Sequence, residues 1–373
     1  MLRVEEIVSF DQWRVVRGQW DKILRDANCL SPFFAYDWFE CSVESFGNEK
    51  EIKILLVWDG SQLIGLFPFW QFLEIQFSIP IRKIGFISNP DTPFVDFFIL
   101  AKKRQEVLIT LLDYLLQGRK KTWDVLSLEQ WPGDSQNFLL FRDLLSERGL
   151  HFSIGQSSQT PFIQISGQWE TFLQTRSVRF RKSHRNIVNK IHRLPNVDPQ
   201  CFVRDSDGVV FDTVLDIAAR GWKHKEGLAI SSREDFRRFF KRMTGIAGQK
   251  GWLMVWLLNI DGKSIAVEYD FVCDKKVYAL RADFDEAYQS LSPGAYLEYH
   301  IIKFLFENDY IEYSTGPGLN AYKLNWTDQV RVNFALQLYN KTVRGLVLWK
   351  YVQLRRFLKQ MRDCTKEKNL MYE

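Results

Sequence analysis

Residues 54–66 read ILLVWDGSQLIGL, and residues 255–267 read VWLLNIDGKSIAV. In each segment an apolar run leads into an Asp-Gly pair and a second apolar run follows. This pattern predicts two strands joined by a tight hairpin turn. One Asp-Gly hairpin is a common feature, so the sequence around each hairpin decides whether the chain contains a duplication.

The same order of elements surrounds both hairpins: a helix, the hairpin, a further strand, an apolar helix and a short strand. A matching order is a better indication of a repeat than any single match. We therefore predict an α/β (α+β) fold of two similar halves, each a mixed and mostly antiparallel sheet flanked by helices. The paired elements are the helices 36–46 and 232–249, the helices 105–117 and 295–307, and the strands 123–128 and 310–314.

The size and composition of the chain agree with two domains. Its 373 residues exceed one ordinary core, and 46% hydrophobic with 25% charged residues is a globular composition. A connection rich in Ser, Gln and Gly over 157–168 indicates the boundary. We expect a first half at 1–165 and a second half at 166–373.

Several classes of protein are excluded by what the sequence lacks. The first residues contain no apolar signal-peptide core, and the longest apolar run, 63–81, is broken by Pro68 and Pro80. Five cysteines without a C-x-x-C pair argue against a disulfide framework and a zinc site, and favour a reducing compartment. We expect a cytoplasmic protein with no bound metal and no DNA partner.

The positive charge is local. Seven cations and no acid lie within 176–193, and the rest of the chain has 43 basic against 45 acidic residues. Arg179, Arg181 and Lys182 within this stretch indicate either an anionic partner or a solvated helix face, where we also expect His184 and His192. The amphipathic stretch 342–362 could contact anionic lipid, but such a helix more often packs on its own domain.

Two segments follow predicted strands of the second half and are candidate ligand sites. Residues 289–295 open the helix 295–307, where free amides and the helix dipole attract an anion; an ordinary helix cap is the alternative. The glycine-rich loop 314–326 follows the strand 310–314 and brings polar side chains to its end. Tyr322 and Trp326 could instead be core residues, with Lys323 a surface amine.

Together these segments resemble the CelD-type acetyltransferases, a branch of the GNAT superfamily related to the FemAB peptidyltransferases and often found with bacterial polysaccharide synthesis. The resemblance covers 170–330, and the first half matches only as a weaker GNAT-like repeat. It implies that acetyl-CoA or another acyl-CoA is the cosubstrate, held through Gln289, Ser292, Gly294 and Ala295. Ser292 replaces the first glycine of the GNAT phosphate loop, and Pro293 lacks an amide hydrogen. The implied substrate-binding residues are Arg179, Arg181, Lys182, Trp222, Lys223, Gly316, Tyr322, Lys323 and Trp326.

The predicted reaction is direct acyl transfer from a thioester or ester to an amine or hydroxyl of a phosphate-bearing or sugar acceptor. A carboxylate or water then takes the proton of the acceptor. Glu268 and Asp270 alternate onto one face of a predicted strand, and Asp283 ends the next, so these three are the candidate bases. We also expect peripheral contact with membrane-bound polysaccharide synthesis machinery. The alternatives are a peptidyltransferase that uses aminoacyl-tRNA and a non-catalytic GNAT-like binding subunit.

Overall fold

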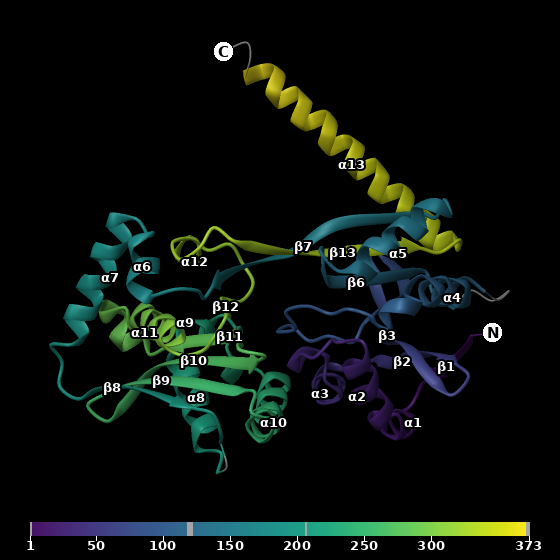
Figure 1. The fold of residues 1–373 in the computed structure, drawn as a ribbon. Coiled ribbons are helices and arrows are strands. Elements are labelled where there is room, and N and C mark those ends of the chain that lie inside the picture. Colours follow the sequence, from purple (N-terminus) through teal and green to yellow (C-terminus); the bar gives the residue numbers. More distant parts are fainter. Residues whose placement is uncertain (1, 118–121, 206, 371–373) are drawn as a thin grey trace.

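The protein folds into two lobes joined by one continuous 13-stranded sheet (Figure 1). The structure, a computed structural model, describes residues 2–117, 122–205 and 207–370, with the backbone alone from 359 onward. The fold is mixed α/β, and its sheet is mostly antiparallel and flanked by helices, as predicted.

The first lobe contains the hairpin predicted at 54–66. Its strands pair from Asp59 with Gln62, and Gly60 turns the chain at a φ of +59°. A positive φ at the first turn residue is the geometry of a type II′ turn, which glycine adopts without strain. The elements of this lobe are β1 (Arg3–Ile7), α1 (Phe10–Val15), α2 (Arg17–Asp26), η1 (Pro32–Phe34), α3 (Tyr36–Phe46), β2 (Lys50–Asp59), β3 (Gln62–Gln76), β4 (Ile79–Phe86), β5 (Phe98–Ile99), η2 (Ala101–Lys103), α4 (Arg104–Leu116), β6 (Val125–Pro132) and α5 (Gln136–Glu147).

The second lobe repeats this order around the hairpin predicted at 255–267. Here Ile260 pairs with Lys263, and Asp261 and Gly262 both have positive φ, as a type I′ turn requires. The elements that follow residue 151 are β7 (Phe152–Gln164), α6 (Trp169–Gln174), α7 (Val178–Ile191), β8 (Val197–Phe202), α8 (Val209–Arg220), α9 (Trp222–Lys225), η3 (Ile230–Ser232), α10 (Glu234–Lys250), β9 (Leu253–Ile260), β10 (Lys263–Cys273), β11 (Lys276–Phe284), η4 (Glu286–Leu291), α11 (Pro293–Glu307), β12 (Glu312–Ser314), α12 (Ala321–Leu324), β13 (Val330–Tyr339) and α13 (Val343–Leu370). Of these, β13 and the first turns of α13 lie against the first lobe.

The two hairpins occupy equivalent places in the sheet. In the first lobe the strand order runs β1, β2, β3, β4, β6, and in the second it runs β8, β9, β10, β11, β12. The last pair of each series is parallel, Lys83–Gly85 with Val125–Ser127 and Lys276–Tyr278 with Glu312–Ser314. This correspondence supports our proposal that the chain consists of two related halves.

The stretch expected to connect the halves is a strand. Residues 157–164 form the second part of β7, which pairs with β13 along most of its length and with β12 at its end. The prediction of a connection there was wrong because both edges of β7 find hydrogen-bonding partners far away in sequence. As a result β13, which follows residue 166, lies beside β6 in the sheet of the first lobe.

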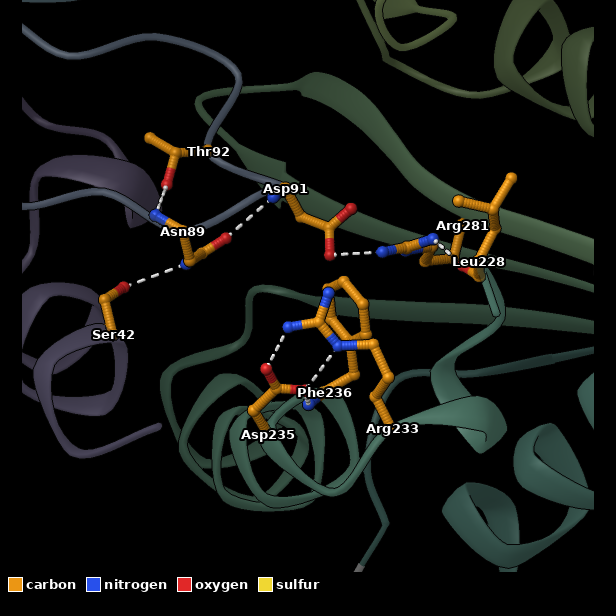
Figure 2. A network of polar contacts seen from close by, with 9 residues as sticks. All are labelled: Ser42, Asn89, Asp91, Thr92, Leu228, Arg233, Asp235, Phe236 and Arg281. Atoms are coloured by element: carbon orange, nitrogen blue, oxygen red, sulfur yellow. Dashed lines mark hydrogen bonds and ion pairs between the residues drawn. The ribbon is translucent and has the colours of Figure 1, made fainter. Parts of the chain in front are cut away.

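The lobes contact each other through an apolar cluster and a polar network. Phe33 and Trp38 of the first lobe pack with Phe239 and Phe271 of the second. Figure 2 shows the polar contacts nearby, where the Asp91 carboxylate pairs with the guanidinium of Arg281 at 2.7 Å. These contacts fix the loop that follows β4 against the edge of the candidate site described below.

Within the described residues, no helix is long and apolar enough to cross a membrane. The amphipathic stretch 342–362 begins α13, which extends away from both lobes (Figure 1). Its first turns pack on the first lobe, through Leu348 against Ile81 and Val125. The stretch was expected to pack on its own half, but its first turns pack on the first lobe. Its side chains beyond residue 358 lie outside the described residues.

Candidate active site

The candidate site lies where β11 and β12 diverge. These parallel strands pair only from Lys276–Tyr278 to Glu312–Ser314. Just beyond, Tyr269 of β10 pairs with Arg281 and Asp270 pairs with Ala279, so β11 has one extra residue, a β-bulge. Gly316 follows β12 at a φ of +76°, and a Cβ there would come within 2.9 Å of the Ala279 carbonyl oxygen. The site therefore requires glycine at this position.

Three carboxyl groups are buried at this point. Glu268 and Asp270 both come from β10, as predicted, and Glu298 comes from α11. The hydroxyl of Tyr313 donates to Glu268, and the indole nitrogen of Trp326 donates to Glu298 at 3.0 Å. Neither carboxyl oxygen of Asp270 has a hydrogen-bond partner among the described residues.

Lys323 is buried, with 6% of its surface exposed, so the alternative interpretation of this residue as a surface amine was wrong. Its ammonium donates to the carbonyl oxygens of Gly316 at 2.9 Å and Pro317 at 3.0 Å. The glycine-rich loop folds over the side chain because its own carbonyls accept these hydrogen bonds. Trp326 is also buried, whereas Tyr322 is 53% exposed.

Burial dominates the electrostatics of this cluster. It raises the pKa of Glu268 to about 7, against the opposing effects of Tyr313 and Lys323. Burial, and then the charge of Glu268, raise the pKa of Glu298 to about 8. Burial lowers the pKa of the Lys323 ammonium to about 8, although both glutamates oppose that change. Burial and Glu268 together raise the pKa of Asp270 well above its usual range. At neutral pH this cluster can therefore exchange protons.

Asp283 and Lys223 lie next to the cluster. The Lys223 ammonium is 3.4 Å from a carboxylate oxygen of Asp283 and donates to the carbonyl of Ala282. Burial raises the pKa of Asp283, and the charge of Lys223 opposes this. The charge of Lys223 also opposes the rise in the pKa of Glu268. Lys223 and Asp283 therefore lie within electrostatic range of the carboxyl cluster. Trp222 beside it is exposed.

The segment expected to bind the donor precedes α11. Ser292 occupies the cap position with a φ of +55°, and its hydroxyl makes no capping hydrogen bond within the described residues. Its amide donates to the carbonyl of Gln289, and Pro293 has no amide hydrogen. Gly294 and Ala295 lie in the first turn of α11, where main-chain amides lack partners within the helix and can bind an anion.

The basic stretch forms α7, which packs beside α11 and η4. Arg179 and Lys182 are exposed, and Arg181 is partly buried. Among the described residues, none of these three cations forms an ion pair. His184 is buried rather than solvated, because the helix turns it toward Trp326, with ring centroids 5.0 Å apart. His192 is exposed, as expected.

A cavity of about 740 Å³ lies elsewhere, between the first lobe and the start of α10, where Arg233, Asp235 and Arg238 also line it. Gly85 and Ser127 line it where β4 and β6 diverge, the position that corresponds to the candidate site of the second lobe. Lys50, Trp70 and Glu129 also line it. We place the chemistry in the second lobe, since the buried carboxyl cluster lies there.

Sequence reasoning missed Glu298 and Tyr313. Both lie in apolar segments, at positions that a periodicity analysis assigns to the core. The one available signal was the charge of Glu298 on the buried face of α11, beside Leu297 and Ile301. A carboxylate on such a face is rarely tolerated without a partner or a function.

Comparisons with known proteins identify a family domain within the second lobe. Residues 179–324 match the family model described as an acetyltransferase (GNAT) domain, and this segment contains Glu268, Glu298 and Lys323. No curated protein matches the sequence.

The fold is similar to several solved structures of low sequence identity. FemX is 11% identical with a TM-score of 0.56, over 89% of this chain and 96% of FemX. The C-terminal domain of a protein described as a lysylphosphatidylglycerol synthetase from Agrobacterium fabrum is 12% identical with a TM-score of 0.53, over 92% of this chain and 97% of that domain. L-PGS from Bacillus licheniformis is 11% identical with a TM-score of 0.51, over 84% of this chain and 94% of L-PGS. Residues 179–324 of the second lobe thus match a GNAT acetyltransferase domain, and this match supports an acyltransferase.

Proposed function

We propose that the second lobe transfers an acyl group directly from a thioester or ester donor to an amine or hydroxyl. The observation that carries this proposal is the buried cluster of Glu268, Glu298 and Lys323 at the divergence of β11 and β12. Its groups have pKa values of about 7 to about 8, which suits proton transfer at neutral pH.

In the proposed reaction the ionised carboxylate of Glu268 takes the proton of the acceptor as its nitrogen or oxygen attacks the acyl carbon. A tetrahedral oxyanion forms, and nearby positive charge, including that of Lys323, stabilises it. The oxyanion then collapses, the bond to the leaving sulfur or oxygen breaks, and the leaving group takes a proton from the neutral carboxyl of Glu298. The proton on Glu268 then passes, directly or through solvent, to the carboxylate of Glu298, so that both residues return to their starting states and no net proton is released.

The donor is proposed to be an acyl-CoA or another phosphate-bearing acyl compound, held at the start of α11 by Gly294 and Ala295 together with Gln289 and Ser292. Calorimetry with acetyl-CoA tests this directly. Binding without turnover on any acceptor would favour the non-catalytic binding subunit, and an absence of binding would remove coenzyme A as the donor.

The variant Gly294→Asp is expected to abolish donor binding and leave the fold intact. A side chain fits there, because a Cβ would meet only a carbon of Phe284 at 3.6 Å. An acid in the first turn stabilises a helix but repels a phosphate. Calorimetry and thermal melts measure both properties, with Gly294→Ala as the uncharged control. Undiminished acetyl-CoA binding by Gly294→Asp would place the donor elsewhere.

Arg179, Arg181 and Lys182 of α7 are proposed to attract a phosphate-bearing or sugar acceptor. These cations lack carboxylate partners among the described residues, so an anionic substrate should bind more weakly as salt rises. The expected result is a KM that increases with ionic strength and a weaker salt dependence in Arg179→Gln/Lys182→Gln. An equal salt dependence of the two proteins would make this helix a solvated face.

A second candidate is a peptidyltransferase that takes its acyl group from aminoacyl-tRNA. The unpaired cations of α7 would suit RNA, and two free amides at α11 are few for a pyrophosphate. Release of labelled amino acid from charged tRNA tests this candidate. The name of the Agrobacterium protein denotes synthesis of an aminoacylated lipid, and this is also acyl transfer.

The biological setting belongs to the same proposal. The CelD-type resemblance supports a role in bacterial polysaccharide or cell-envelope biosynthesis, in the cytoplasm and beside membrane-bound synthesis machinery.

A further inference from the structure

One face of α13 is fixed to the first lobe. Leu348 is buried against Ile81 and Val125, and the ring of Trp349 stacks on His151 at 3.9 Å between centroids. About two turns further on, the guanidinium of Arg356 donates to the carbonyl of Ile154 at 3.0 Å. These contacts determine which side of the helix points away from the protein.

The opposite face of α13 is apolar and exposed. Val347, Tyr351, Leu354 and Leu358 recur at helical spacing, and Leu354 is 55% exposed. An amphipathic helix of a globular protein usually turns its apolar stripe toward the core. In α13 the apolar stripe faces outward, so packing against the core of the protein does not explain it.

The hairpin between β3 and β4 extends the same surface. Leu73, Ile75 and Phe77 alternate along the end of β3 and its turn, and all three are exposed. The ring centroids of Phe77 and Tyr351 are 4.3 Å apart, so the hairpin tip and the helix form one patch. We call these residues, with the exposed stripe of α13, the C-terminal apolar surface.

Positive charge lies beside this surface on α13. Residues 343–358 contain Arg344, Lys350, Arg355 and Arg356 and no acid. Among the described residues none of these cations forms an ion pair. A groove of about 620 Å³ lies between the hairpin tip and the helix. Its lining includes Phe77, Tyr351, Leu358, Arg355 and Arg356.

We propose that the C-terminal apolar surface docks on the anionic phospholipids of a membrane. Apolar side chains beside unpaired cations fit a bilayer surface, where the former enter the acyl region and the latter meet lipid phosphates. A second copy of this chain would bring like charges together, which disfavours a dimer through this face. The binding is peripheral, and it is independent of the proposed acyl transfer because no substrate takes part.

Vesicle flotation tests the proposal with the full chain. The protein should bind vesicles of phosphatidylcholine with phosphatidylglycerol, bind vesicles of phosphatidylcholine alone far less, and dissociate as salt rises. Leu354→Asp should weaken binding by about ten- to a hundredfold, because burial of one leucine is lost. Lys350→Gln should weaken binding about fivefold.

Leu140→Asp, on α5 of the first lobe, is the matched control and should bind as the wild type does. Thermal melts confirm that each variant is folded. Failure of the wild type to bind anionic vesicles would overturn the proposal, and so would equal binding by Leu354→Asp and Leu140→Asp. Sedimentation velocity that shows a dimer lost in Leu354→Asp would assign the surface to a second copy instead.

Discussion

Glu268→Gln is expected to lower kcat by about a hundred- to ten-thousandfold, the range that a positioned general base contributes. The glutamine keeps the size of the side chain and an oxygen that can accept from the Tyr313 hydroxyl, but it cannot take a proton. In the wild type, kcat/KM should rise through about pH 7 as Glu268 ionises. The variant should lack this rising limb.

Stability separates this effect from damage to the fold. Burial raises the folded-state pKa of Glu268 from 4.5 to about 7, so the folded state holds its proton more tightly than the unfolded state. This group therefore makes the wild type less stable as pH rises from about 4.5 to about 7. Glu268→Gln has no proton to lose and should be at least as stable as the wild type above pH 7.

Urea unfolding at two pH values measures this difference, with exposed Glu147→Gln as a control that should alter neither property. A folded Glu268→Gln protein with wild-type kcat would exclude Glu268 as the base. Asp283, whose partner is Lys223, would then be the next carboxylate to test.

The sequence predicted those parts of the fold that local signals determine. The pairs Asp59-Gly60 and Asp261-Gly262 were sufficient to predict the two hairpins, because a tight turn with positive φ depends on the residues within it. It could not predict that β13 enters the sheet of the first lobe, since hydrogen bonding between β13 and β6 joins strands far apart in sequence. A polar loop and a strand such as β7 can also have the same composition, so composition alone could not distinguish them.

The sequence predicted those candidate site residues that follow the alternating pattern of a strand. Glu268 and Asp270 share a face of β10 because side chains alternate along a strand. Glu298 and Tyr313 became visible only when α11 and β12 were placed against β10. The burial of Lys323 also could not be predicted. Its hydrogen bonds go to main-chain carbonyls, and because every residue has such a carbonyl, no side chain in the sequence marks the acceptors.

Lys323→Met is expected to lower kcat/KM at pH 7 by roughly ten- to a hundredfold, from the loss of a charged hydrogen-bond donor beside the reacting groups. Removal of this positive charge should also raise the pKa of Glu268 and move the rising limb of the pH profile upward. The difference from the wild type should narrow above about pH 8, where the wild-type Lys323 amine itself becomes neutral.

Because Lys323 is buried, stability should change as well. The variant leaves the carbonyls of Gly316 and Pro317 without their donor, which costs about 1–3 kcal/mol for an unsatisfied buried group. In the wild type the folded-state pKa of Lys323 falls from 10.5 to about 8, so the unfolded state binds more protons between these values. Lys323 thus contributes a rise in wild-type stability with pH from about 8 to about 10.5, and Lys323→Met should lack that contribution.

Lys323→Arg provides the control that keeps the charge. It should retain the rising limb near that of the wild type while losing stability, because a larger guanidinium must fit a buried position. Kinetics across pH and urea unfolding of the three proteins measure both effects. A Lys323→Met protein that is destabilised but keeps its kcat/KM and its pH profile would show that the lysine only holds the loop 316–320. The proton-sharing cluster would then consist of the two glutamates alone.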